Sequence, residues 1–347
     1  MKSCKSIIFI LVIFLKTGNV LSNENIFIVN NIELTKKANI SNQDIANQAI
    51  KQGFERLTKK ILLKRDIDRL SKLSFSQIKN LVSYYQVQDL NEGSKNNILS
   101  FNISFDKKKL HDLFYKINIS YSEIVDKEIF LLPVYIKNDQ VFIYSKNFFY
   151  EKWNLLYENN LIDFILPIEN IEIIQKINLN KKNLLNINLR SLFPEYKNKN
   201  LALILIEDTG SKSEKIFIKT SILEKNIDKS VLIKRSNLGE EKYFEKIIKN
   251  VSEELVNLIK SQNLVDVRIP SFLNTKFKSN RKFNLVDLDE RIKKIELIDY
   301  IYVQELNKDY VMIKIKYLGK LDKIIKQLEE QNVILKFINE EWRIKII

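Results

Sequence analysis

The chain has 347 residues and a formal net charge of +14, and its composition is 45% apolar and 29% charged. These proportions are typical of a folded chain and exclude an intrinsically disordered one, and the single cysteine excludes a disulfide-rich scaffold. Lysine, asparagine and isoleucine are so abundant that an AT-rich codon bias is enough to explain much of the lysine. The positive charge alone is therefore weak evidence for a partner.

Residues 1–22 are typical of a secretory signal peptide. Two lysines precede an apolar run over residues 6–15, the run ends at Lys16, and short side chains stand where cleavage would follow Ser22. The run is too short to cross a bilayer, which needs roughly 20 apolar residues. We therefore predict cleavage after Ser22 and an exported, periplasmic protein. The alternative is an uncleaved segment that anchors the protein in the inner membrane.

Cleavage would also change the chemistry that the mature chain offers. It would remove Cys4, the only cysteine, so that no thiol nucleophile, thiolate ligand or disulfide is expected in the mature protein. Cys4 precedes the apolar run, whereas the lipid-modified cysteine of a lipoprotein follows it, so we expect no lipid anchor there. The net charge would fall to about +11 because three lysines leave with the segment.

The mature chain begins with a predicted N-terminal α/β domain over residues 23–125. Its long helix places apolar residues on one face, which predicts packing against a sheet. The expected elements are a strand at 26–34, a helix from about 41 to 63, strands at 82–90 and 98–105 joined by a turn at 91–94, and a helix from about 108 to 117.

A central α/β domain is predicted over residues 126–262. Pro133 interrupts its first apolar run, and because proline donates no ladder hydrogen bond, we expect it at the end or the edge of a strand. The expected elements are strands at 129–136 and 141–144, a helix with Phe149, Trp153 and Leu156 on one side, a short stretch at 164–167, strands at 201–207, 216–223 and 230–235, and an amphipathic helix at 240–261.

Residues 263–280 contain Pro270 and few periodic apolar positions, so we predict a linker. The C-terminal α/β unit then covers residues 281–347. Its expected elements are helices at 288–298 and 321–330, paired strands at 300–305 and 310–317, and a hairpin of 333–338 with 342–346 that turns at Asn339-Glu340. The predicted fold class is α/β (α+β), with two α/β sandwich-like domains and this small unit.

Four stretches carry a resemblance to a known family. They are the helix positions Asp44, Ala46, Ala49, Gly53, Phe54 and Leu57; the strand Phe101 to Asp106; Leu132-Pro133-Val134; and, at the far end, Tyr317-Leu318-Gly319, Leu321, Leu328, Val333 to Leu335 and Trp342. These features resemble the exported proteobacterial proteins grouped as domain of unknown function 2066. The resemblance implies an exported bacterial protein and brings no activity with it. Residues 170–213 depart from the family's pattern.

Candidate catalytic side chains are few. His111 is the only histidine, and its place beside leucines on a predicted helix favours a half-buried or surface residue over a general base. Ser76, Ser104 and Ser279 each stand three residues before a lysine, as in the S-x-x-K motif of exported serine hydrolases. That motif's companion Ser-Asp-Asn does not occur, and the only Lys-Thr-Gly lies within residues 1–22. We therefore expect no catalytic residue, and an exported serine hydrolase is the alternative.

The sequence also limits ligands and partners. One histidine and one cysteine cannot supply a multi-histidine or multi-thiolate metal site, and the glycines are too far apart for a phosphate-binding loop. We expect no metal and no cofactor. No arginine-rich stripe with interleaved aromatic residues is present, so we expect no nucleic-acid partner. A basic surface would favour acidic envelope polymers or anionic lipid headgroups.

These observations lead to one functional expectation. The predicted signal peptide and the scarcity of catalytic side chains favour an exported, non-catalytic protein that binds another component of the cell envelope, either a protein or a polymer. Peripheral contact with the membrane is compatible with the basic surface.

Overall fold

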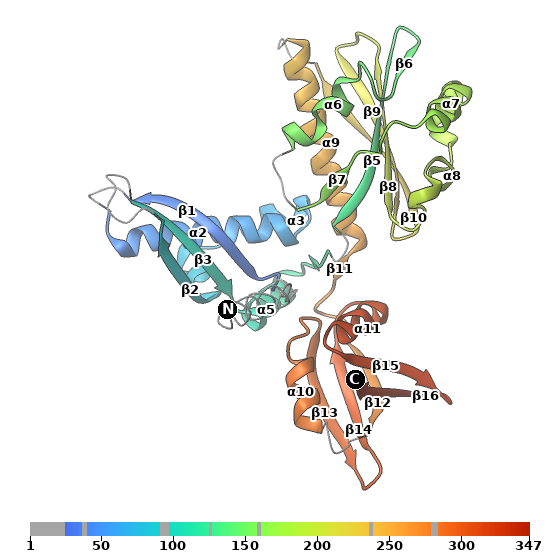
Figure 1. The fold of residues 1–347 in the computed structure, drawn as a ribbon. Helices are drawn as coiled ribbons and strands as arrows, with labels where there is room; N and C mark the ends of the chain where they lie inside the picture. The colour runs from blue at the N-terminus through green and yellow to red at the C-terminus, as the bar shows by residue number, and fades with distance from the viewer. Residues whose placement is uncertain are drawn as a thin grey trace, which may run out of the picture. The chain divides into compact units, whose positions relative to one another are not determined.

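The structure is a computed structural model that describes residues 25–36, 40–90, 97–124, 127–157, 161–235, 239–278 and 284–347 (Figure 1). It contains helices and strands in mixed and antiparallel sheets, which confirms the predicted α+β fold. The predicted signal peptide and the turn at 91–94 lie outside the described residues. The described residues form two compact units, which are taken from residues 1–57, 73–116 and 270–347, and from residues 58–72 and 117–269.

The first unit contains a three-stranded antiparallel sheet of order β1-β3-β2, formed by β1 (Ile28–Lys36), β2 (Val82–Asp89) and β3 (Asn97–Phe105). Helix α2 (Asn42–Ile61) approaches this sheet closely at Gly53. A Cβ atom at Gly53 would lie 2.8 Å from Cδ1 of Ile103, so the absence of a side chain lets the helix and the sheet meet. Helix α5 (Lys107–Ile117) follows β3 and confirms the predicted helix.

The end of α2 and helix α3 (Lys64–Leu70) group with the central residues. Helix α9 (Glu240–Gln262) holds the end of α2 in this group. Nζ of Lys260 donates to the backbone oxygen of Leu62, at 3.0 Å, and to that of Lys59. Burial lowers the pKa of Lys260 to about 8, whereas the carbonyl oxygens at the end of a helix favour the charged ammonium. The contacts in the structure therefore divide the predicted N-terminal domain, residues 23–125, between the two units.

The second unit is built around the parallel strands β5 (Glu128–Lys137) and β8 (Asn200–Asp208), which pair from Ile129 with Asn200 to Lys137 with Asp208. Most side chains of both strands are buried, as expected for parallel strands that are covered on both faces. The strands β9 (Ser213–Ile222) and β10 (Lys225–Lys234) extend the sheet beyond β8, and β6 (Gln140–Phe142) and β7 (Asp163–Ile165) pair with β5.

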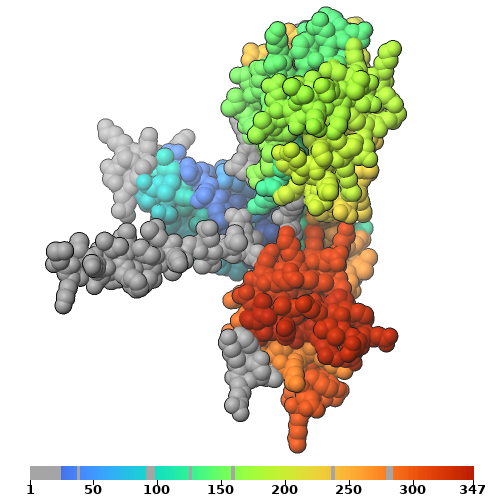
Figure 2. Space-filling view, turned by 45° about the vertical axis from the view of Figure 1, so that its right-hand side comes forward, coloured from blue at the N-terminus to red at the C-terminus, as the bar shows by residue number. Residues whose placement is uncertain are grey.

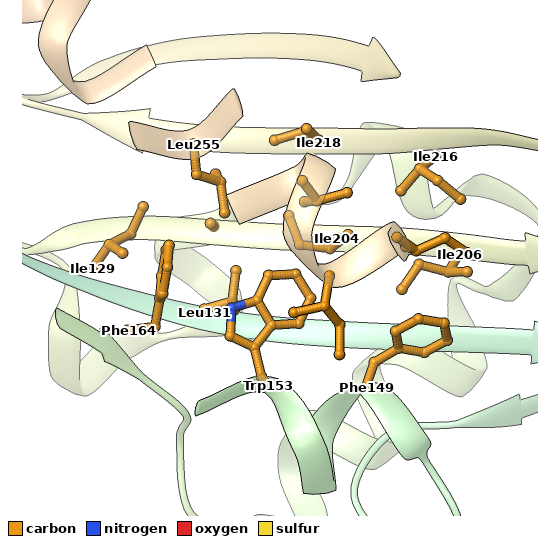
Figure 3. Packing of buried hydrophobic residues seen from close by; sticks show 14 of the residues in the cluster. Ile129, Leu131, Phe149, Trp153, Phe164, Ile204, Ile206, Ile216, Ile218 and Leu255 are labelled. Carbon is orange, nitrogen blue, oxygen red and sulfur yellow. The ribbon is translucent and has the colours of Figure 1, made fainter. Parts of the chain in front are cut away.

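Alternate residues of this sheet pack on opposite faces. On one face, α6 (Phe148–Leu156) and α9 form a core in which Trp153, Ile204 and Leu255 are buried (Figure 3). On the other face, residues of α7 (Ile171–Leu179) and α8 (Leu189–Leu192) pack with Leu132 and Leu203. A short two-stranded sheet of β4 (Tyr121–Ser122) and β11 (Leu264–Val265) completes the unit.

Pro133 lies in the middle of β5, and the prediction that it occupies a strand end or a sheet edge is wrong. β7 pairs with residues 128–130 of β5 and β6 pairs with residues 135–137, so the edge of β5 opposite β8 has a gap between them. The carbonyl oxygen of Pro133 accepts a hydrogen bond from Nδ2 of Asn147, at 2.9 Å. The missing N–H therefore faces the gap, and the pairing with β8 is unaffected.

The C-terminal residues, orange to red in Figure 2, form a five-stranded sheet of order β13-β14-β12-β16-β15. Its elements are β12 (Ser271–Phe277), α10 (Leu285–Ile292), β13 (Ile298–Leu306), β14 (Val311–Tyr317), α11 (Leu321–Glu330), β15 (Val333–Ile338) and β16 (Glu341–Ile346). The predicted hairpin is confirmed, and its turn residues Asn339 and Glu340 have φ values of 51° and 63°. The predicted helix at 288–298 is shorter, since β13 begins at Ile298.

The segment 263–280 is not a linker as predicted, because it contains β11 and the central strand β12. In β12 the buried residues alternate, and they are Leu273, Thr275 and Phe277. Thr275 occupies a core position and donates a hydrogen bond to the backbone oxygen of Trp342, at 3.1 Å. Because Thr275 interrupts the alternation of apolar and polar residues, the sequence pattern did not predict this strand.

Asn147 provides a test of how the gap beside β5 is closed. The side chain is fully buried, and its Nδ2 donates to the backbone oxygens of Pro133, Phe142 and Ile143 while its Oδ1 accepts from the amides of Phe149 and Tyr150. We expect Asn147→Ala to lower the free energy of unfolding by about 3 kcal/mol or more, since several buried polar groups lose their partner. Urea-induced unfolding of the purified protein measures this change.

Asn170 offers the matched control, because it caps α7 with two accepted hydrogen bonds at a more exposed position. Asn170→Ala should cost about 1 kcal/mol, the usual value for a helix cap. Equal losses for the two variants would contradict the role that we assign to Asn147.

Candidate functional site

Neither of the two described S-x-x-K motifs forms a serine–lysine pair. Ser76 and Lys79 are exposed on α4 (Phe75–Asn80). Ser104 is buried in β3, and Nζ of Lys107 lies 3.8 Å from a carboxylate oxygen of Glu296. Within the described residues, neither motif forms a hydrogen bond between its serine and its lysine. Ser279 lies outside the described residues.

His111 is half-buried on α5, with its ring 5.8 Å from that of Phe27 in an edge-to-face arrangement. Burial and, to a smaller extent, the positive charge of Lys107 lower the pKa of His111 to about 4. The imidazole is therefore neutral near pH 7, and it lies among packing contacts on α5.

A buried group of charged side chains lies where β5 and β8 end. Asp208 and Glu214 hydrogen-bond to each other, and Arg235 lies 3.3 Å from Oδ1 of Asp208. Tyr135 and Tyr243 donate to Asp208 and Glu214, at 3.0 and 3.3 Å. Both carboxyl groups are nearly inaccessible to solvent, with exposed fractions of 5% and 1%. The group therefore joins β5, β8, β9, β10 and α9, and no substrate can reach its carboxyl groups.

The two carboxyl groups of this cluster hold one proton between them near pH 7. Burial and the adjacent Asp208 raise the pKa of Glu214 to about 7. Burial acts to raise the pKa of Asp208 as well, but hydrogen bonds from Glu214 and from the amide of Gly210 lower it to about 2. Asp208 is therefore the charged partner of Arg235, and Glu214 is the donor.

The described residues contain neither a membrane-spanning helix nor a metal site. None of their helices is both long and apolar enough to cross a membrane. They also contain no group of three histidine, cysteine, aspartate or glutamate side chains that could hold a metal ion. A polar pocket of about 410 Å³ beside α10 contains Arg291, whose guanidinium already donates to the backbone oxygen of Gln331, at 2.8 Å.

The C-terminal sheet presents a more promising surface. One set of alternate side chains is buried with α10 and α11, and the opposite set forms what we term the open face. The open face consists of Phe272, Asn274, Lys276, Tyr300, Tyr302, Glu305, Tyr310, Met312, Lys314, Lys316, Ile334, Lys336, Ile338, Glu341, Arg343 and Lys345. Cationic and aromatic side chains predominate in this set, and no serine, histidine or cysteine is among them.

Lysines and aromatic rings alternate on the open face. Nζ of Lys314 lies 4.6 Å from the ring centre of Phe272, and Nζ of Lys316 lies 5.9 Å from that of Tyr300. The rings of Tyr300 and Tyr302 are 6.1 Å apart, and about half of each side chain is exposed. Such a surface can bind negative charge through the ammonium groups and flat apolar groups through the rings.

No residue of the open face is among the candidate site residues predicted from the sequence. The sequence of β14 does indicate which of its side chains share a face. Its buried residues Val311, Ile313 and Ile315 alternate with Met312, Lys314 and Lys316. The period of two predicts which side chains share a face. It does not predict that β12 and β16 place further cations beside them, because strand order is not a local property of the sequence.

Comparisons with known proteins add little to this description. No protein family matches the chain, and no curated protein does. A solved structure described only as an uncharacterized protein is 11% identical, and the match covers 40% of this chain and 94% of that one with a TM-score of 0.17. A likeness at this level supports no conclusion about function.

The carboxyl cluster predicts a pH-dependent effect of Glu214→Gln. The native state keeps Glu214 protonated up to about pH 7, whereas the ordinary pKa is 4.5, so the parent protein loses stability as the pH rises through this window. Glutamine cannot ionise, and its amide can still donate to Asp208. We expect the variant to gain about 2–3 kcal/mol relative to the parent between pH 5 and pH 8.

Chemical denaturation at both pH values measures this difference. Glu207→Gln, at an exposed position on β8, serves as the control and should show no comparable gain. A Glu214→Gln variant that loses stability relative to the parent as the pH rises would contradict the proton-sharing arrangement.

Proposed function

We propose that the protein is an exported, non-catalytic binding protein of the cell envelope, and that it holds another envelope component on the open face. The observation that carries this proposal is the open face itself, a sheet surface on which lysines and aromatic rings predominate and which holds no serine, histidine or cysteine. The sequence of residues 1–22 supports export. The resemblance to an exported family of unknown function is compatible with both parts of the proposal.

The proposal can be separated from its alternatives by residue chemistry. A serine hydrolase needs a serine activated by a neighbouring base, and Lys107, beside Ser104, is held instead by Glu296. A membrane-tethered form differs from the proposed form only in its N-terminus. Each alternative therefore has its own measurement.

Intact-mass analysis of the protein from fractionated cells tests export. We expect a mass that begins at Asn23 in the periplasmic extract, since the apolar run is typical of a cleaved signal. A mass that begins at Met1 in the membrane fraction, resistant to a carbonate wash, would favour the tethered form. The same mass in the cytosol would contradict export.

Labelling with a fluorophosphonate probe tests the absence of a catalytic serine. We expect the native protein to show no labelling above that of the heat-denatured protein, because no activated serine is proposed. Labelling that disappears in Ser76→Ala, Ser104→Ala or Ser279→Ala would instead establish the hydrolase and contradict the non-catalytic proposal.

A further inference from the structure

We infer that the open face binds an anionic polysaccharide, in which sugar rings carry regularly spaced carboxylate groups. The inference deepens the proposed function and rests on it for the compartment, since export would bring the face into contact with envelope polymers.

The charges form a row across three neighbouring strands. Lys276 of β12 is in register with Arg343 of β16, and Arg343 is in register with Lys336 of β15. Neighbouring strands lie about 4.8 Å apart, and like charges directly opposite each other destabilise a sheet. We call these three residues the cation row.

Neutralisation of the cation row within the protein is incomplete. Lys276 forms an ion pair with Glu341. Among the residues that the structure describes, no carboxylate lies within ion-pair distance of Arg343 or Lys336, and both side chains are exposed. An anionic ligand would relieve the repulsion that the sheet otherwise bears.

The number of cations in the row favours a polymeric anion. A polyuronate carries one carboxylate on each sugar ring, so a single chain can present several negative charges to the cation row at once. On β13, which β14 separates from β12, Tyr302 offers an exposed ring against which the apolar face of a sugar ring can pack, with a hydroxyl group at its tip.

The open face is less suited to two other anionic partners. Single-stranded nucleic acid is commonly bound by several aromatic rings that take successive bases, whereas Lys314 and Lys316 lie over the rings of Phe272 and Tyr300. Membrane-surface proteins commonly insert an amphipathic helix, and the aromatic residues here lie on sheet strands among lysines. A sugar polymer fits the cations and needs only the exposed ring of Tyr302.

The test uses the protein as the cell processes its N-terminus. The purified protein is titrated with polygalacturonate at low and at moderate salt concentration, and binding is measured. We expect binding that weakens as salt increases. The double variant Lys336→Gln with Arg343→Gln should raise the dissociation constant by about tenfold or more. Its melting temperature without polymer should equal or exceed that of the parent, because two unneutralised like charges are removed.

The double variant Lys225→Gln with Lys234→Gln is the matched control, since both lysines are exposed on β10 of the other unit. It should bind polygalacturonate as the parent does. If both double variants bound polygalacturonate equally weakly, the effect would come from the overall charge of the protein and not from the cation row. That result would overturn the inference. Equal binding of uncharged dextran, or binding of oligothymidylate or phosphatidylglycerol vesicles in place of polygalacturonate, would overturn it as well.

The outcome is distinguishable from a failure of the proposed function. If the intact mass begins at Asn23 but polygalacturonate does not bind, the inference fails and the export proposal stands. If binding depends on the cation row but the intact mass begins at Met1 in the cytosol, the ligand assignment stands and the export proposal fails.

Discussion

The pairing of β5 with β8 is the constraint on which the second unit depends. Most side chains of both strands are buried, so each of these must be apolar or find a partner inside the unit. The apolar residues meet this requirement by packing against four helices. The polar groups of the two strands meet the requirement through hydrogen bonds and ion pairs. Asn147 binds the carbonyl group of Pro133, and the carboxyl cluster lies where both strands end. Helix α9 then carries Lys260 from this core to the end of α2.

Much of the fold could be predicted because its signals are local. The apolar runs of β5 and β8, the amphipathic period of α9 and the turn at Asn339-Glu340 each depend on adjacent residues, and the structure contains all of them. The errors arose where a distant residue decides the outcome. Pro133 is tolerated inside a strand because its missing N–H faces the gap between β6 and β7, and Thr275 is tolerated in a core because its hydroxyl group donates a hydrogen bond to the backbone oxygen of Trp342.

The same reason explains why the candidate site was not predicted. The alternation in β14 is visible in the sequence, and from it the shared face of Lys314 and Lys316 can be derived. The cation row cannot be derived in this way, because Lys276 and Arg343 are far apart in the chain and meet only through the parallel pairing of β12 with β16. A chain rich in lysine gives no hint of which lysines will be neighbours.

The carboxyl cluster and the cation row show two responses to crowded charge. In the cluster, burial forces a solution inside the protein, and a proton and Arg235 supply it. On the open face, solvent screens the charges, so the sheet can form although Arg343 and Lys336 lie in register. Stability alone gives no reason for two cations at facing positions, since one acidic residue there would be more favourable. Local rules that a folded protein breaks tend to lie at functional sites, and two facing cations without an acidic partner fit the anionic ligand that we propose for this face.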